Sequence, residues 1–213
     1  MNGYNAGGAM TRRVAAFWLI LAVLIMQFCF AAAAAIPLPK AAQAGYDALK
    51  AHDPQKAAAA FEGFLAAPVP ADIPAATYTG FRLGAMLRLG ECYLALGEPA
   101  KALAQFEAVH KATGGEGATG ATALYKIGTA YTVLGEKTTA QDYYLRACLV
   151  PLSAAEYRSA AWYVKLAYQA IVKARMKAAD YKALLDTMVA NVPAVPEHAE
   201  FLGLLKSEQE KLK

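Results

Sequence analysis

The feature that most constrains the fold of this sequence is a pattern that recurs after 38 residues. Its first copy reads Met86-x-x-Leu89-Gly90-x-x-Tyr93, then Gly97 and Ala102-x-x-x-Phe106; its second reads Leu124-x-x-Ile127-Gly128-x-x-Tyr131, then Gly135 and Ala140-x-x-x-Tyr144. Each copy has helical spacing before and after a glycine, which predicts a helix–turn–helix unit. One such unit cannot bury its own apolar face, so neighbouring units must stack.

The composition agrees with an all-α chain. Hydrophobic residues make up 57% of the 213 residues and charged residues 18%. Much of the apolar excess is alanine, which favours helix, and beyond the N-terminal apolar run no segment rich in β-branched or aromatic residues is long enough to predict a strand. The length suffices for one domain with a continuous core.

The two copies resemble the tetratricopeptide repeat (TPR) family, whose unit is a helix–turn–helix of about 34 residues. Met86 and Leu124 replace the leading aromatic residue of the family pattern. The resemblance implies a short right-handed superhelix of stacked repeats with a concave and a convex face. It covers residues from about 40 to 150 well and the remainder loosely.

Weaker signals extend the array on both sides. A degenerate earlier copy has Gly45 and Ala57-x-x-x-Phe61, whereas after Pro151 residues such as Trp162 and Tyr168 have repeat-like chemistry without a consistent spacing. We therefore predict a TPR domain over residues 38–213, with repeats at about 40–67, 83–113 and 121–151, a degenerate pair at 153–191 and a capping helix at 195–213. A terminal helix with a polar face seals the open end of a stacked array.

The glycines of the repeat have distinct predicted roles. Gly90 and Gly128 lie where the two helices of a pair cross, and Gly97 and Gly135 end the first helix in the left-handed conformation. The stretch Gly115–Gly120 spells G-x-G-x-x-G, but helical spacing precedes it in place of a strand, so we reject a nucleotide site. We expect these glycines to absorb a loop insertion, and alanine at positions 115 and 117 to cost little stability.

The N-terminus reads as an export signal. Arg12 and Arg13 precede an almost wholly apolar run over residues 14–30, and small residues follow over 31–35. This pattern predicts a cleaved signal peptide over residues 1–35, and the five alanines favour cleavage. The alternative is a retained single-pass anchor through residues 14–36 in the inner membrane. Both interpretations place the repeat domain in the periplasm.

The sequence lacks the residue patterns that several functional classes require. The chain has 21 basic and 17 acidic residues, and loss of Arg12 and Arg13 with the leader would leave 19 basic residues. The remaining net positive charge is too small to indicate a protein that binds nucleic acid. No zinc, haem or nucleophile motif occurs, so we predict no enzyme, no cofactor and no metal. Cys92 and Cys148 fall on helices separated by others, and we interpret them as buried thiols.

The resemblance implies a groove lined by the first helix of each pair, where family members bind peptides or protein segments. The asparagines of the family's carboxylate-binding clamp are missing, so that specificity is not carried over. Aromatic residues and Arg dominate binding energy at interfaces, although Tyr125 and Tyr163 could equally pack against the next helix. The candidate groove residues are Tyr46, Leu87, Arg88, Glu91, Tyr125, Lys126, Thr129 and Tyr163.

Three functions remain open. The first is an exported scaffold or adaptor that binds a protein or peptide segment in the cell envelope of a bacterium. The second is a membrane-anchored accessory subunit of an envelope or export complex. The third is an enzyme or carrier whose site the sequence does not reveal. Because Glu91 would disfavour a purely acidic ligand, we expect a partner segment of mixed charge.

Overall fold

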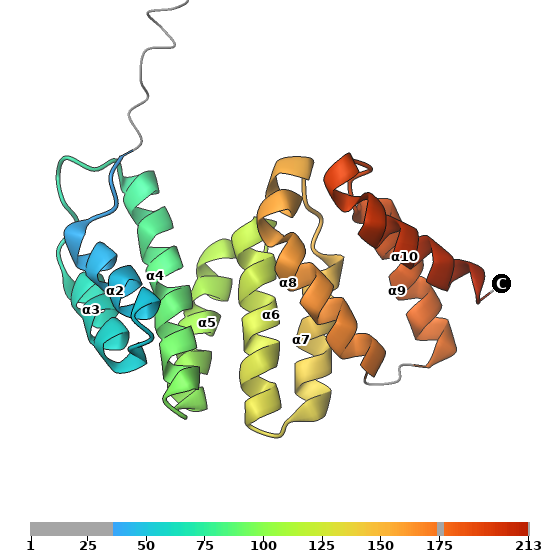
Figure 1. Ribbon diagram of the computed structural model, residues 1–213, viewed down its shortest axis with the longest axis horizontal. Coiled ribbons are helices and arrows are strands. Elements are labelled where there is room, and N and C mark those ends of the chain that lie inside the picture. The colour runs from blue at the N-terminus through green and yellow to red at the C-terminus, as the bar shows by residue number, and fades with distance from the viewer. Residues whose placement is uncertain (1–35, 174–176, 213) are drawn as a thin grey trace, which may run out of the picture. The chain divides into compact units, whose positions relative to one another are not determined.

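The computed structural model describes residues 36–173 and 177–212, and in this part of the chain every regular element is helical (Figure 1). The predicted leader over residues 1–35 lies outside the described residues. Within the described ranges no helix is both long and apolar enough to span a bilayer. The helices are α2 (Lys40–Lys50), α3 (Pro54–Ala66), α4 (Ala75–Ala95), α5 (Pro99–Thr113), α6 (Gly117–Val133), α7 (Lys137–Leu149), α8 (Ala154–Lys173), α9 (Ala178–Asn191) and α10 (Ala199–Glu210), with a 3-10 turn η1 (Pro196–His198) before α10.

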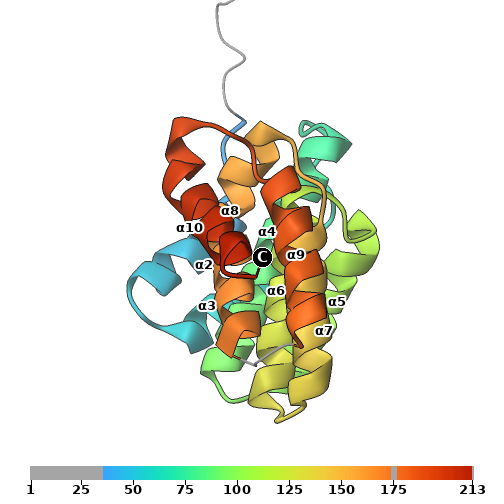
Figure 2. The same cartoon turned by 90° about the vertical axis from the view of Figure 1, so that its right-hand side faces the viewer.

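Within residues 38–173 and 177–212 most helices pack against the next helix in the chain, as expected of stacked repeats, whereas α9 packs against α7 and α10. Three antiparallel pairs come first: α2 with α3, α4 with α5, and α6 with α7. The first helices also meet one another, since α6 packs against both α4 and α8. In the end-on view α8 and α10 lie on one side, and α5, α7 and α9 lie on the other (Figure 2). The predicted all-helical stack of repeats is confirmed.

One glycine–aromatic contact sets the crossing of each of the three pairs. Each first helix presents a glycine to the aromatic ring that follows 16 residues later in the second helix. A Cβ added at Gly45 would lie 2.5 Å from Phe61, one at Gly128 would lie 2.7 Å from Tyr144, and one at Gly90 would lie closer still to Phe106. Real Cβ contacts are longer, so no residue but glycine fits this packing. The predicted crossing role of Gly90 and Gly128 is confirmed.

The turn between the two helices is also repeated. Gly97 and Gly135 have φ of +75° and +84°, in the left-handed region, as predicted. In both turns the next residue donates its backbone N–H to a carbonyl five residues back, Glu98 to Tyr93 at 2.8 Å and Glu136 to Tyr131 at 2.9 Å. His52 occupies the same position in the first pair with φ +57°, where a non-glycine residue is strained.

The expectation of a loop insertion at Gly115–Gly120 is wrong. Only residues 114–116 separate α5 from α6, and the extra length of the repeat lies in these helices, of 15 and 17 residues. Gly115 and Gly117 have φ of +77° and +63°, and a Cβ at Gly115 would lie 2.5 Å from the ring of His110. A Cβ at Gly120 would meet the backbone of Gly115 below van der Waals distance. Alanine at positions 115 and 117 would therefore be strained, contrary to the sequence-based expectation.

The C-terminal helices close the array. Phe201 and Leu205 of α10 are buried, and the ring of Phe201 meets that of Tyr168 on α8 at 5.7 Å. In α8 the buried positions include Tyr157, Val164 and Tyr168, which places Trp162 on the outside with 67% of its surface exposed. The register of α8 therefore differs from that of α4 and α6, in which the repeat tyrosines Tyr93 and Tyr131 are buried and half-buried.

The core of this domain consists of two clusters of buried side chains, one around α2–α5 with Ile127 and Ala130 of α6, and one around α6–α10. Tyr131 and Tyr143 stack at 5.5 Å and pack against both clusters. Cys92 is buried in the first cluster and Cys148 in the second, and both are free thiols. Cys92 lies on α4 and Cys148 on α7, and the structure forms no disulfide between them.

Candidate functional site

A depression of about 240 Å³ lies on the first helices and receives side chains from four of them in succession. Helix α2 contributes Tyr46, and α8 contributes Ser159 and Tyr163. The central helices supply Gly84, Leu87 and Arg88 from α4, and Ala118, Thr119, Thr122 and Lys126 from α6. This volume is below the roughly 300 Å³ at which small-molecule pockets begin, and it suits one or two side chains of a larger ligand.

A charged cluster forms one wall of the depression. Glu91 accepts a hydrogen bond from Arg88 through Oε2 at 2.8 Å, and its other oxygen, Oε1, pairs with the ammonium of Lys126. Arg88 and Glu91 are three residues apart on α4, so both point to the same face. Lys126 comes from α6, and the carboxylate therefore ties two repeats together.

The two cations of this cluster differ in exposure. The Lys126 side chain is only 8% exposed, and its ammonium lies 4.6 Å from the centroid of the Tyr163 ring. The Arg88 side chain is 43% exposed. Burial alone would lower the pKa of Arg88, but the hydrogen bond and negative charge of Glu91 outweigh burial and raise it. Lys126 is thus held inside the protein, whereas Arg88 still has donors for a ligand.

The structure brings five of the eight predicted groove residues into one depression: Tyr46, Leu87, Arg88, Lys126 and Tyr163. Glu91 lies behind the lining, paired with both cations. The Thr129 hydroxyl donates to the Tyr125 carbonyl at 3.1 Å within its own helix and does not line the depression.

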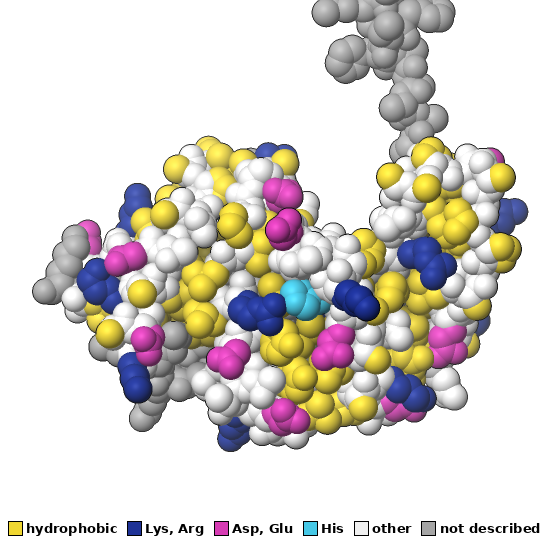
Figure 3. Space-filling view, turned by 180° about the vertical axis from the view of Figure 1, so that it is seen from behind, with side chains coloured by type: hydrophobic (Ala, Val, Ile, Leu, Met, Phe, Trp, Pro, Cys, Tyr) yellow, Lys and Arg dark blue, Asp and Glu magenta, His cyan; other side chains and the backbone are white. Residues whose placement is uncertain are grey.

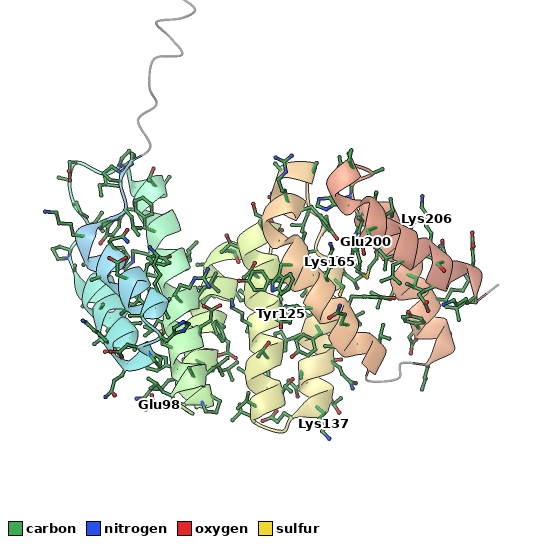
Figure 4. All side chains as sticks on the ribbon, in the orientation of Figure 1. Glu98, Tyr125, Lys137, Lys165, Glu200 and Lys206 are labelled. Carbon is green, nitrogen blue, oxygen red and sulfur yellow. The ribbon has the colours of Figure 1, made fainter. Side chains whose placement is uncertain are left out.

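Tyr125 packs between helices. Its ring centroid lies 5.6 Å from that of Tyr144 and 5.6 Å from that of Tyr163 (Figure 4). Burial is the largest cause of a raised pKa for its hydroxyl. Of the two interpretations left open for this tyrosine, the geometry favours packing, so Tyr125 supports Tyr163 and does not line the depression itself.

Sequence reasoning missed the small residues of the lining. Gly84, Thr122 and Ser159 each precede a recognised groove residue by four positions, which places them on the same helical face one turn away. The helical period was the signal that could have found them. Their small side chains let the charged and aromatic residues form the walls of the depression.

The arrangement offers hydrogen-bond donors and flat rings, and no activated nucleophile. Burial, followed by the charge of Glu91, raises the pKa of the neighbouring Cys92 thiol to about 11, so at neutral pH it carries almost no thiolate. Among the described residues no group of His, Cys, Asp and Glu is arranged to hold a metal ion. This geometry can hold side chains of a bound segment.

Comparison with known proteins gives one family. A tetratricopeptide repeat model matches residues 84–112 and 122–148, the two copies that carry the full sequence pattern. No curated protein and no solved structure matches the chain.

Proposed function

Because this chain is a tetratricopeptide repeat protein, we propose that it is a non-enzymatic scaffold or adaptor that binds a segment of a partner protein across its first helices. The repeats support protein–protein interaction as the general function. The observation that carries the proposal is the convergence of α2, α4, α6 and α8 on one depression. An extended ligand that crosses several helices needs such a continuous surface.

The charged wall gives the groove a fixed geometry. Glu91 holds Arg88 on its own helix and Lys126 on the next, so the guanidinium is positioned before a partner arrives. Preorganised side chains lose less entropy on binding. Arg88, Tyr46 and Tyr163 are also of the residue types that contribute most to binding energy.

The proposed location is the periplasmic side of the bacterial cytoplasmic membrane, on the pattern of residues 1–36. The alternative is a membrane-anchored accessory subunit of an envelope or export complex. The mass of the protein purified from its native cells separates the two, because cleavage removes about 35 residues and an anchor keeps them.

Site-specific photo-crosslinking in cells tests the groove. A photoreactive residue in place of Leu87, which lines the depression, should capture a partner protein. The matched control is Ala104, an exposed position on the second helix of the same pair, and it should capture none. Arg88→Ala should weaken the Leu87 crosslink at least about tenfold and leave the melting temperature nearly unchanged. Capture from Ala104 without capture from Leu87 would move the binding surface to the second helices.

A further inference from the structure

The outward surface of α8 carries an unusual residue for a solvent-exposed helix. Trp162 is 67% exposed, the largest value among the exposed large hydrophobic residues in the described part of the chain. Arg158 precedes it by four positions and Lys165 follows it by three, so the three side chains lie along one face of the helix. We call Arg158, Trp162 and Lys165 the α8 crest.

Residues beside Trp162 on α8 line two depressions, and Lys165 of the α8 crest belongs to the second of them. Ser159 and Tyr163 belong to the groove depression shared with α4 and α6. On the other flank a second depression of about 530 Å³ is shared by α8 and α10, and Figure 4 labels Lys165 and Glu200 from its two sides. Its lining also includes Tyr168, Phe201 and Leu204. A segment that leaves the groove over α8 therefore passes Trp162 and reaches a second hollow lined by both apolar and charged side chains.

The charge of the first helices is positive. Among the described side chains of helices α4, α6 and α8, five are basic and two acidic; the basic residues are Arg82, Arg88, Lys126, Arg158 and Lys165, and the acidic ones are Glu91 and Glu156. Both carboxylates are already engaged. Glu91 pairs with two cations, and Glu156 accepts hydrogen bonds from the backbone and the hydroxyl of Ser153 at 2.9 Å and 2.7 Å.

The cations of the α8 crest, in contrast, have no carboxylate partner among the described residues. Arg158 and Lys165 take part in no ion pair there, and the Lys165 ammonium lies 5.4 Å from the centroid of the Phe201 ring. The sequence-based expectation of a mixed-charge ligand rested on Glu91, whose charge is in fact neutralised within the protein. Glu200, on the α10 side of the second depression, also takes part in no ion pair among the described residues, so the unpaired positive charge is concentrated on α8, at Arg158 and Lys165.

We propose that the α8 crest anchors an acidic partner segment that also carries an apolar side chain. The apolar side chain covers the Trp162 ring, and flanking carboxylates of the segment pair with Arg158 and Lys165. Tryptophan and arginine dominate binding energy because they combine a large apolar area with directed hydrogen bonds. This inference rests on the proposed groove function and names the chemistry of its ligand.

Fluorescence of Trp162 tests the inference directly. The chain has two tryptophans, Trp18 and Trp162, so Trp18→Phe in the full-length chain leaves Trp162 as the only indole. The probes are a short peptide of Glu, Leu and Ser and a matched peptide with Lys in place of each Glu. The acidic peptide should shift the Trp162 emission to shorter wavelength, bind at least about tenfold more tightly than the basic peptide, and weaken as salt is raised.

Two further variants assign the affinity to the α8 crest. Trp162→Ala should weaken binding of the fluorescein-labelled acidic peptide at least about tenfold, at an unchanged melting temperature. Val133→Ala, which alters a side chain that is 57% exposed away from the crest, should leave the affinity unchanged. Equal affinity for the two peptides, or full affinity in Trp162→Ala, would overturn the inference. If Leu87 still captures a partner in that case, the groove function survives and only its acidic chemistry is wrong.

Discussion

At the scale of single residues, the packing of each repeat depends on an absent side chain. The first helix of each pair contacts the aromatic ring of the second helix at a glycine: Gly45, Gly90 or Gly128. Each of these glycines lowers the intrinsic stability of its helix but allows the close contact. Helix α4 also contains Gly80, an exposed glycine with no atom within 4 Å of its added Cβ. The same helix thus provides a tight and an open glycine for comparison.

Gly90→Ala should therefore destabilise the protein by about 1–3 kcal/mol, because its methyl group would overlap the Phe106 ring. Gly80→Ala should stabilise it by about 0.5–1 kcal/mol, because alanine favours helix and fills open space. Urea unfolding of both variants measures the difference. Equal midpoints would show that the Phe106 ring moves aside at no cost, and that the crossing contact does not set the fold.

At the scale of elements, the Arg88–Glu91–Lys126 cluster joins two repeats through charge. The Lys126 side chain is only 8% exposed, and its ammonium depends on a carboxylate from the preceding repeat. The Arg88 guanidinium keeps much of its water and depends less on the same carboxylate. Loss of the Glu91 carboxylate should therefore destabilise Lys126 more than Arg88.

Glu91→Ala should destabilise the protein by about 3 kcal/mol, because it leaves the buried ammonium of Lys126 without a counter-charge. Arg88→Ala should cost less than about 1 kcal/mol, since a partly exposed ion pair contributes little. The double variant Glu91→Ala with Lys126→Met should recover much of the loss. Urea unfolding of the three variants measures these costs, and a Glu91→Ala cost no greater than that of Arg88→Ala would mean that Lys126 escapes to solvent.

At the scale of the whole repeat domain, two core clusters meet at the stacked pair Tyr131 and Tyr143. Each cluster contains one buried cysteine, which makes the thiols reporters for both halves. Burial raises the pKa of both thiols, that of Cys92 to about 11. At pH 8, below these pKa values, both groups are almost entirely protonated and unreactive.

In a Cys29→Ser background, Cys92 and Cys148 should react with a thiol reagent at pH 8 only when the helices open. The labelling rate should rise with denaturant for both residues, because each needs unfolding of its cluster. A reducing agent should leave the melting temperature unchanged, since both thiols are free. Rapid labelling of either cysteine in the native protein, followed by mass spectrometry of the digest, would contradict the buried packing.

Much of the fold follows from local patterns in the sequence. The spacing of Gly90, Tyr93, Gly97 and Phe106 determines a helix, a turn and a second helix, and its recurrence after 38 residues requires stacking. The charge of Arg88 and its place on a first helix were also evident. These features involve residues within a few helical turns of one another, and helical geometry alone determines which of them share a face.

Only the tertiary structure decided which side chains are available at the surface. Periodicity places Tyr125, Lys126 and Trp162 on helix faces, but the depth of each side chain depends on how far its helix stands from the next one. The approach of α4 to α6 buries Lys126 against Glu91, 35 positions earlier, and the shifted register of α8 turns Trp162 outward. Contacts between residues so far apart in the chain arise from packing, which no local pattern specifies.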